Sequence, residues 1–244
     1  MPQATFAFDP DAALRAYHEV GFHLEPDVWT TAACERLIAA GEDLPGPRAG
    51  RRAPVMNPHR VEPTFFAALR SPAITGVLER ILGGRLVGLQ TQLFFCPPGT
   101  PGFSPHQDNF YVQARPDVFA SAWTALEDAD AENGSLVLWP RSHQEPVLAV
   151  EDVPAHRLSP TQNPNANARQ VVLPPGYRPL SIVVPRGAVV FLHGHVVHGS
   201  HDNRSANRWR RSLLMTYIRL GEPFRAGRDA GRAAVSLDER AAAG

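Results

Sequence analysis

The residue pattern of this 244-residue sequence changes near Arg85. After that point, short runs rich in β-branched and aromatic residues alternate with clusters of Pro and Gly. Strands are predicted at residues 86–96, 120–126, 135–139, 180–184, 188–193 and 212–220. Short strands at irregular spacing, with turn residues instead of helices between them, favour a β-sandwich or jelly roll over a parallel βαβ sheet.

The part of the chain before residue 85 predicts mostly helices. Asp9-Pro10 suits the cap and first position of a helix that Gly21 ends, and residues 22–25 alternate like a short strand. Thr31 is expected to cap a second helix. Further helices are predicted at residues 63–70 and, after the Ser71-Pro72 cap, up to Gly83.

Three other segments read as irregular. Residues 44–60 are Pro-rich and predict a loop, and residues 151–179 are rich in Pro and Asn, which is typical of a lid or binding loop. The Ala- and Arg-rich tail after Gly221 is expected to fray. We therefore expect one domain over 1–244, with a mostly helical part at 1–84, a mainly β core at 85–220 and a tail at 221–244.

Composition excludes several classes of function. The chain has no Lys, and its 24 Arg balance 24 Asp plus Glu. Schiff-base enzymes, pyridoxal phosphate enzymes and Walker-type ATPases all need a Lys. A net charge of zero argues against a nucleic-acid partner. No apolar run is long enough for a membrane span, and no signal peptide is visible. Two Cys cannot build a disulfide framework, so a cytoplasmic location is expected.

The segment Pro105-His106-Gln107-Asp108 carries a candidate metal site. Side chains two apart on extended chain point the same way, so His106 and Asp108 would offer an imidazole and a carboxylate on one face. A distant His would complete a two-His, one-carboxylate triad, the ligand set of non-haem Fe(II) oxygenases. His193, His195 and His198 are the candidates, and His198 sits where a strand is expected to end.

A series of motifs from Gln90 to Tyr217 agrees in kind and order with one family. These motifs are Gln90, Gln92, Phe94 and Pro97-Pro98-Gly99; the His106 segment; residues 122–126 and 132–136; Trp139-Pro140-Arg141-Ser142-His143; residues 186–191; His198-Gly199-Ser200; and Arg210-Arg211. With them, and with residues 17–22, the chain resembles the phytanoyl-CoA dioxygenase family of Fe(II)/2-oxoglutarate oxygenases.

The resemblance implies a mainly β fold, a double-stranded β-helix of the jelly-roll or cupin-like type, with flanking N-terminal helices. It implies His106, Asp108 and His198 as iron ligands. It further implies Fe(II), the cosubstrate 2-oxoglutarate and O₂ as the reaction's cofactors. Related halogenases lack the carboxylate ligand, so Asp108 implies a hydroxylase and not a halogenase.

The distal carboxylate of 2-oxoglutarate needs a buried cation, and Arg binds carboxylates with two hydrogen bonds. By resemblance, Arg210 is the first choice and Arg211 the second, with Ser200 assisting. The interval from His198 to Arg210 is one residue longer than is usual in the family, so Trp209 takes the expected position and a bulge or longer turn must absorb the difference. Other groups expected beside the cosubstrate are Gln90 and Gln92, which share one strand face, and Trp123.

The substrate is less constrained. Candidate contacts are Arg51, Arg52, Asn57 and His59 in the Pro-rich loop, Asn109 and Tyr111 after the His106 segment, and the 151–179 loop. A small metabolite or natural-product intermediate is favoured over an acyl-CoA, because no Lys-rich surface is present to hold nucleotide phosphates. The sequence leaves the oligomeric state open.

The predicted reaction is hydroxylation of an unactivated C–H bond, with release of succinate and CO₂. Epoxidation, desaturation or cyclisation would need only a different substrate pose. Two alternatives remain: a zinc hydrolase that uses the same two His and one carboxylate, and a jelly-roll binding module without catalysis.

Overall fold

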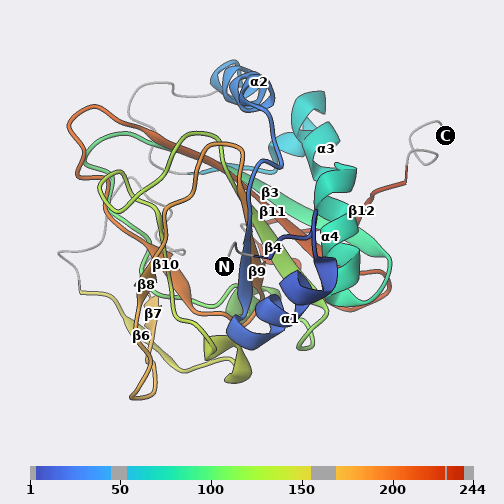
Figure 1. Cartoon of the computed structure of the whole chain (residues 1–244), viewed down its shortest axis with the longest axis vertical. Helices are drawn as coiled ribbons and strands as arrows, with labels where there is room; N and C mark the ends of the chain where they lie inside the picture. The colour runs from blue at the N-terminus through green and yellow to red at the C-terminus, as the bar shows by residue number, and fades with distance from the viewer. Residues whose placement is uncertain (1–3, 45–53, 155–168, 229, 239–244) are drawn as a thin grey trace.

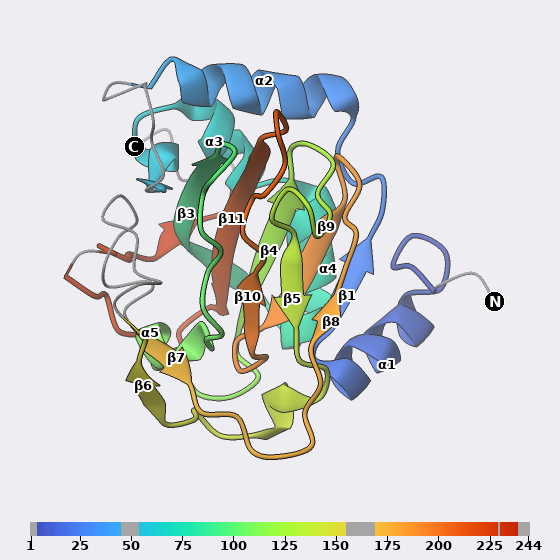
Figure 2. The same cartoon turned by 90° about the vertical axis from the view of Figure 1, so that its left-hand side faces the viewer.

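The computed structural model describes residues 4–44, 54–154, 169–228 and 230–238. A seven-stranded antiparallel sheet faces a three-stranded one, which gives the predicted jelly-roll core (Figure 2). The large sheet runs in the order β1 (Phe22–Glu25), β9 (Val189–His193), β4 (Phe119–Ala125), β11 (Arg210–Arg219), β3 (Leu86–Cys96) and β12 (Val235–Ser236), with β2 (Val55–Met56) also on β3. The small sheet is β10 (His198–Ser200), β5 (Leu136–Leu138) and β8 (Leu180–Ser181). A separate hairpin joins β6 (Val150–Asp152) to β7 (Arg169–Val171).

Both faces of the large sheet are covered, which explains why β3, β4, β9 and β11 are buried at almost every position. Figure 1 shows the four longer helices on one side of it and the small sheet on the other. The helices are α1 (Pro10–Val20), α2 (Thr31–Glu42), α3 (Pro63–Leu69), α4 (Pro72–Leu82) and the short α5 (Asn109–Val112), with 3₁₀ turns η1 (Pro58–Arg60) and η2 (Ser142–Gln144). Phe65, Leu69 and Ile74 from α3 and α4 pack with Leu213 and Met215 of β11.

The pairing of β3 with β11 fixes which side chains face the space between the sheets. Arg210 pairs with Cys96, Leu214 with Gln92 and Thr216 with Gln90. Because side chains alternate along a strand, these residues share the face toward the small sheet, whereas the residues between them face the helices.

Two of the predicted helix caps differ in the structure: the cap of α2 lies one residue earlier, and Ser71, at the start of α4, makes no side-chain capping hydrogen bond. Asp9 caps α1 by accepting a hydrogen bond from the Ala12 amide at 3.0 Å, and Gly21 ends this helix with a φ of 87°. Thr30, not Thr31 as predicted, caps α2 by accepting from the Ala33 amide. Two adjacent Thr give the sequence no means of choosing between them.

The tail is more ordered than the sequence indicates. Residues 221–228 and 230–238 are described, and β12 pairs with β3 through Val235 and Ser236. The prediction of fraying is therefore wrong up to residue 238. The predicted loops also contain short strands: β2 in the first, where it pairs with β3, and β6 and β7 in the second, where they pair with each other. Among the described helices, none combines the length and the apolar character that crossing a membrane requires.

Candidate active site

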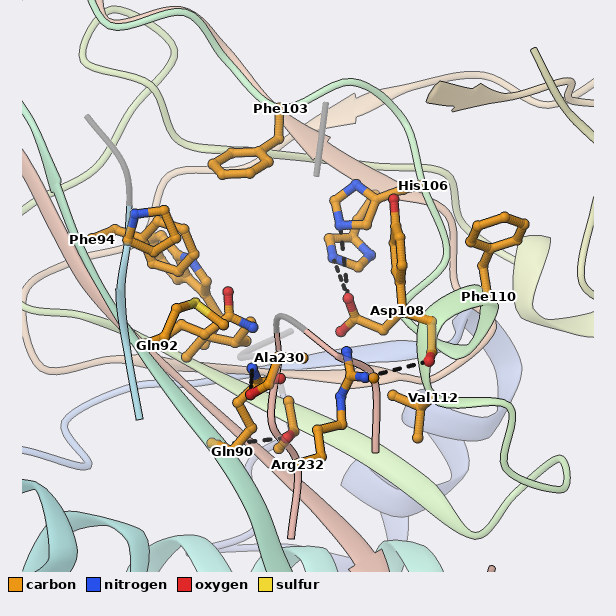
Figure 3. A pocket seen from close by; sticks show the side chains of 18 of the residues that line it. Gln90, Gln92, Phe94, Phe103, His106, Asp108, Phe110, Val112, Ala230 and Arg232 are labelled. Atoms are coloured by element: carbon orange, nitrogen blue, oxygen red, sulfur yellow. Dashed lines mark hydrogen bonds and ion pairs between the residues drawn. The ribbon is translucent and has the colours of Figure 1, made fainter. Parts of the chain in front are cut away.

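A cavity of about 710 Å³ opens between the two sheets. This volume is in the range of sites that hold a small molecule. Strands β3, β4 and β11 supply one wall, and β5 and β10 supply the other. Residues of the C-terminal part, from Arg225 to Arg228 and from Ala230 to Arg232, also line it (Figure 3).

His106, Asp108 and His198 converge on this cavity. Their ligand atoms all lie within 4.8 Å of one another. The Asp108 Oδ1 atom is 3.7 Å from His106 Nε2 and 3.8 Å from His198 Nε2. Two backbone hydrogen bonds, of 2.9 and 3.0 Å, join His106 to His198, so residues 92 apart in the chain are held as a pair.

The geometry that brings Asp108 to the two histidines differs from the one predicted. Only His106 lies in a β-bridge, whereas Asp108 has helical dihedrals (φ −58°, ψ −35°) and directly precedes α5. Between them, the buried Gln107 donates to the His195 carbonyl at 2.8 Å and accepts from the Leu148 amide. A turn anchored by Gln107, and not strand alternation, therefore makes the two ligands converge.

Each histidine is oriented by a carbonyl group. The Nδ1 atom of His106 lies 2.8 Å from the Ser104 carbonyl, and that of His198 lies 3.1 Å from the Val196 carbonyl. Since a carbonyl only accepts hydrogen bonds, each Nδ1 must carry the proton. Both Nε2 atoms therefore keep a lone pair that can bind a metal. This arrangement is typical of metal-binding histidines.

The charges also suit a metal. Burial, helped by His198, lowers the pKa of His106 to about 4, so the imidazole is neutral at pH 7. Burial raises the pKa of Asp108, but His198, His106 and a 2.6 Å hydrogen bond from the Ser121 hydroxyl outweigh it, and the pKa falls. Two imidazoles and one carboxylate are the donors that non-haem Fe(II) accepts, with coordination positions left for other ligands.

The other two histidine candidates lie elsewhere. His193 Nε2 contacts Asp117 at 2.8 Å, and His195 Nε2 accepts from the Asn109 amide at 2.7 Å. Neither belongs to the cluster that His106, Asp108 and His198 form.

Arg210 and Arg211 point to opposite faces of β11. Arg210 lines the cavity and is 3% exposed. Its guanidinium contacts the Cys96 sulfur at 3.0 Å and Ser212 at 3.3 Å, and its Nε has no hydrogen-bond partner among the described residues. Arg211 instead forms ion pairs with Glu127 at 2.7 Å and Glu42 at 3.3 Å.

The longer interval before Arg210 is absorbed by a turn. Asn203 holds residues 201–209 together by donating to the carbonyls of Cys96 and Arg208, and Ser205 bonds back to the Asn203 amide oxygen. The register of β11 with β3 then runs unbroken from Arg210 to Thr216. Trp209 lies under the Arg211 guanidinium, 4.8 Å from it, outside the cavity lining.

The remaining groups predicted beside a cosubstrate all line the cavity. They are Ser200, Gln90, Gln92 and Trp123. Ser200 accepts a hydrogen bond from the Phe103 amide at 2.9 Å, so its hydroxyl proton is available to an oxyanion. Gln90 is 1% exposed, and its Oε1 atom has no partner in the described structure.

Of the residues predicted to bind substrate, the structure places one in the cavity lining and three outside it. Tyr111 lines the cavity. Asn57, His59 and Asn109 are outside its lining: Asn57 donates to the Ala230 carbonyl, His59 lies 2.7 Å from the Thr91 hydroxyl, and Asn109 ties α5 to Ala114. Arg51 and Arg52 lie outside the described residues, as does much of the 151–179 loop.

Two residues that the sequence analysis missed contribute to the site. Ser121 holds Asp108 by the hydrogen bond described above. It lies two positions before Trp123 on a predicted strand, so the period-two pattern could have placed it on the cavity face. Arg232 reaches the cavity from the tail, and nothing in its local sequence marks it.

The comparisons agree with this arrangement. Over residues 17–212 the chain matches the family model "Phytanoyl-CoA dioxygenase (PhyH)". It is 32% identical over 158 residues to the peroxisomal phytanoyl-CoA dioxygenase of Rattus norvegicus. The aligned region covers 63% of this chain and 45% of that protein. It is 30% identical over 165 residues to a phytanoyl-CoA dioxygenase domain-containing protein of Danio rerio. That alignment covers 60% of this chain and 50% of the relative. The chain spans about half the length of these curated relatives.

Solved structures share the fold. The non-heme α-ketoglutarate-dependent carbocyclase SnoK from nogalamycin biosynthesis matches with a TM-score of 0.74 at 19% identity, over 97% of this chain and 100% of that one. The epimerase SnoN from the same biosynthesis matches with a TM-score of 0.72 at 19% identity, over 88% and 85%. The family model covers most of the sequence, and the chain therefore belongs to the phytanoyl-CoA dioxygenase (PhyH) family.

Proposed function

We propose that the chain is an Fe(II)- and 2-oxoglutarate-dependent oxygenase that oxidises an unactivated C–H bond of a small metabolite or natural-product intermediate. The products from the cosubstrate are succinate and CO₂. One observation carries the proposal: a His-Asp-His cluster and a buried arginine without a carboxylate partner among the described residues line the same cavity.

In this proposal, His106, Asp108 and His198 hold Fe(II), and the iron when bound supplies the activation of O₂ that C–H oxidation requires. The three protein ligands are tied down by Ser104, Val196 and Ser121. Fixed ligands keep the positions for 2-oxoglutarate and O₂ on the cavity side.

Arg210 pairs with the distal carboxylate of 2-oxoglutarate, and its Nε and guanidinium donors supply the hydrogen bonds. Ser200 donates its free hydroxyl proton to the same carboxylate. Burial of the Arg210 side chain strengthens the pairing, because charges attract more strongly where water is excluded. Gln90, Gln92 and Trp123 complete the wall and keep water from the cosubstrate.

We propose hydroxylation as the reaction type. The structural neighbours include an epimerase and a carbocyclase, so the same fold supports other outcomes. Asp108 provides the carboxylate ligand, and a halide therefore has no vacated ligand position to occupy. Choice among oxidations depends on how the substrate C–H bond is held.

Arg210 also separates this proposal from a zinc hydrolase. A hydrolase with two His, one carboxylate and a bound water needs no buried arginine at the far end of its cavity. A buried guanidinium without a carboxylate partner is costly unless a ligand pairs with it, and 2-oxoglutarate is such a ligand.

The test is conversion of 2-oxoglutarate to succinate by the purified chain with Fe(II), Zn(II) or no metal. We expect succinate with Fe(II) alone, and its loss in His198→Ala. Because substrate is unknown, the slow turnover that occurs without substrate is measured by NMR over hours. His195→Ala is the matched control and should keep the activity. Succinate formation that does not depend on His198, or hydrolysis with Zn(II), would contradict the proposal.

A further inference from the structure

The C-terminal strap, residues 224–228 and 230–238, is fastened across the edge of the cavity. The side-chain amides of Asn57 and Gln90 both donate to the Ala230 carbonyl, at 2.9 and 3.3 Å. Further along, β12 pairs with β3, and Arg70 donates to the Leu237 carbonyl at 3.1 Å. These contacts use the backbone of the strap, and its side chains from Arg225 to Arg232 that line the cavity include three arginines.

The charges around the cavity are unbalanced. Among the described residues, its lining contains five arginines and two aspartates: Arg169, Arg210, Arg225, Arg228, Arg232, Asp108 and Asp152. The charges of Fe(II) and 2-oxoglutarate cancel each other, so they leave the positive excess of three unchanged. Three of the arginines come from the strap. A cavity with this excess attracts anions and disfavours cations.

Arg232 is the strap arginine best placed to contact a ligand. Figure 3 shows its side chain extending toward Asp108. One terminal nitrogen donates to the carbonyls of Tyr111 and Arg225, at 3.3 and 3.4 Å. Its Nε is buried and has no partner in the described structure. The guanidinium is thus held in one place while part of its donor fork remains unused.

The cavity also has an apolar wall near Arg232. Phe110 and Val112 line it on the side of Arg232, and Phe103 lines it beside His106 (Figure 3). This wall suits a hydrocarbon or ring body, which would bring C–H bonds close to the metal ligands. An anionic group on that body would then lie within reach of Arg232.

We propose that Arg232 binds an oxyanion of the substrate, a carboxylate or a phosphate, and so makes the enzyme specific for apolar compounds that carry one such group. The proposal rests on the proposed function, because it defines the substrate of the same site. Arg210 anchors the cosubstrate, and Arg232 anchors the substrate on the other side of the metal ligands. Arg225 and Arg228 contribute to the positive rim of the cavity.

The experiment uses matched pairs of probes that differ in charge. Straight-chain carboxylates and alkyl phosphates of four to ten carbons are compared with the alcohols of the same length. Dissociation constants are measured anaerobically by calorimetry on the chain loaded with Mn(II) and 2-oxoglutarate. Paramagnetic broadening of the probe protons by Mn(II) reports whether the probe lies beside the metal. Proteins compared are wild type, Arg232→Gln, Arg232→Lys and the control Arg211→Gln.

For the wild type we expect at least one acid of the series to bind about 10-fold more tightly than its alcohol, with broadened proton signals, consistent with one charge-assisted contact. Arg232→Gln should remove that preference, Arg232→Lys should restore part of it, and Arg211→Gln should keep it. The Kd of 2-oxoglutarate should stay within twofold in all of them. Carboxylates as the best probes would identify an acid as the substrate, and alkyl phosphates a phosphate ester.

Equal binding of acids and alcohols, binding of no probe by the wild type, or an acid preference that survives Arg232→Gln would overturn the proposal. So would a loss of 2-oxoglutarate binding in Arg232→Gln, because Arg232 would then serve the cosubstrate. A wild type that binds Mn(II) but no 2-oxoglutarate would instead contradict the proposed function. Thermal unfolding of each variant separates a loss of folding from a loss of binding.

Discussion

Strand β11 has two faces with different tasks, although their residues alternate in one stretch of chain. Arg210, Leu214 and Thr216 line the cavity, whereas Leu213 and Tyr217 pack against the helices. On the helix face, Tyr217 donates to the Leu69 carbonyl at 2.9 Å, and the Arg211 guanidinium meets two carboxylates although its Nε has no partner among the described residues. On the cavity face, Arg210 has a buried Nε without a partner and contacts no carboxylate among the described residues. A buried guanidinium without an anionic partner indicates where an anionic ligand belongs.

The largest expected effect comes from neutralising one of the two adjacent arginines. Arg210→Gln should raise the Kd of 2-oxoglutarate about 1,000-fold, or about 4 kcal/mol, because it removes one partner of a buried charge pair. Arg211→Gln should leave that Kd within twofold and lower the free energy of unfolding by about 1 kcal/mol, since its ion pairs are partly exposed. Calorimetry with 2-oxoglutarate and urea unfolding measure the two quantities. Equal effects of the two variants on the Kd would contradict the assignment.

A second pair of variants compares the packing of the two faces. Leu213 is fully buried among the helices, and Leu213→Ala should cost about 3 kcal/mol of unfolding free energy through the cavity it leaves. Leu214 borders an existing cavity, so Leu214→Ala should cost about half as much. Urea unfolding of both variants tests the difference, and a larger loss for Leu214→Ala would mean that the cavity face bears the packing.

A smaller effect is expected at Ser200. Ser200→Ala removes the hydroxyl that would donate to the 2-oxoglutarate carboxylate, and should weaken 2-oxoglutarate binding about fivefold, or about 1 kcal/mol. Ser181→Ala on β8 is the control, because Ser181 lies outside the cavity lining, and it should leave the Kd unchanged. A Kd unchanged by Ser200→Ala would remove Ser200 from the cosubstrate site.

The smallest effect concerns pH and a histidine far from the metal ligands. Burial, helped by Arg60, lowers the pKa of His59 to about 4, below the value of about 6.5 in an unfolded chain. Between these pH values the unfolded state binds a proton that the folded state does not bind. The free energy of unfolding therefore falls as the pH drops from about 6.5 to about 4. His59→Asn should reduce this slope by up to about 1 kcal/mol per pH unit. Urea unfolding at several pH values measures the slope, and an unchanged slope would contradict the lowered pKa.

Much of the β core could be predicted from the sequence because its strands are long and apolar. The predicted limits of β3, 86–96, are those observed, and the predicted 188–193 differs from β9 by one residue. The strands that were missed are β2, β6, β7, β10 and β12, of two or three residues each. Such short segments become strands through their partners, so local pattern does not reveal them.

The candidate site shows the same division. His106, Asp108, Ser200 and Trp123 lie in recognisable motifs, and all four line the cavity. The 151–179 loop and Asn57 were proposed from loop composition, which does not say which way a side chain points; Asp152 and Arg169 of the loop line the cavity, whereas Asn57 does not. Arg232 was missed because its position depends on backbone contacts of the strap with distant residues.

The binding of Fe(II) and 2-oxoglutarate in one cavity can be observed in a single anaerobic titration. We predict that wild-type protein with equimolar Fe(II) develops a weak visible charge-transfer band on addition of 2-oxoglutarate, saturating at one equivalent. His198→Ala should not develop the band. Absence of the band in the wild type, or a band of equal strength in His198→Ala, would contradict the assignment of His106, Asp108 and His198 as the iron ligands.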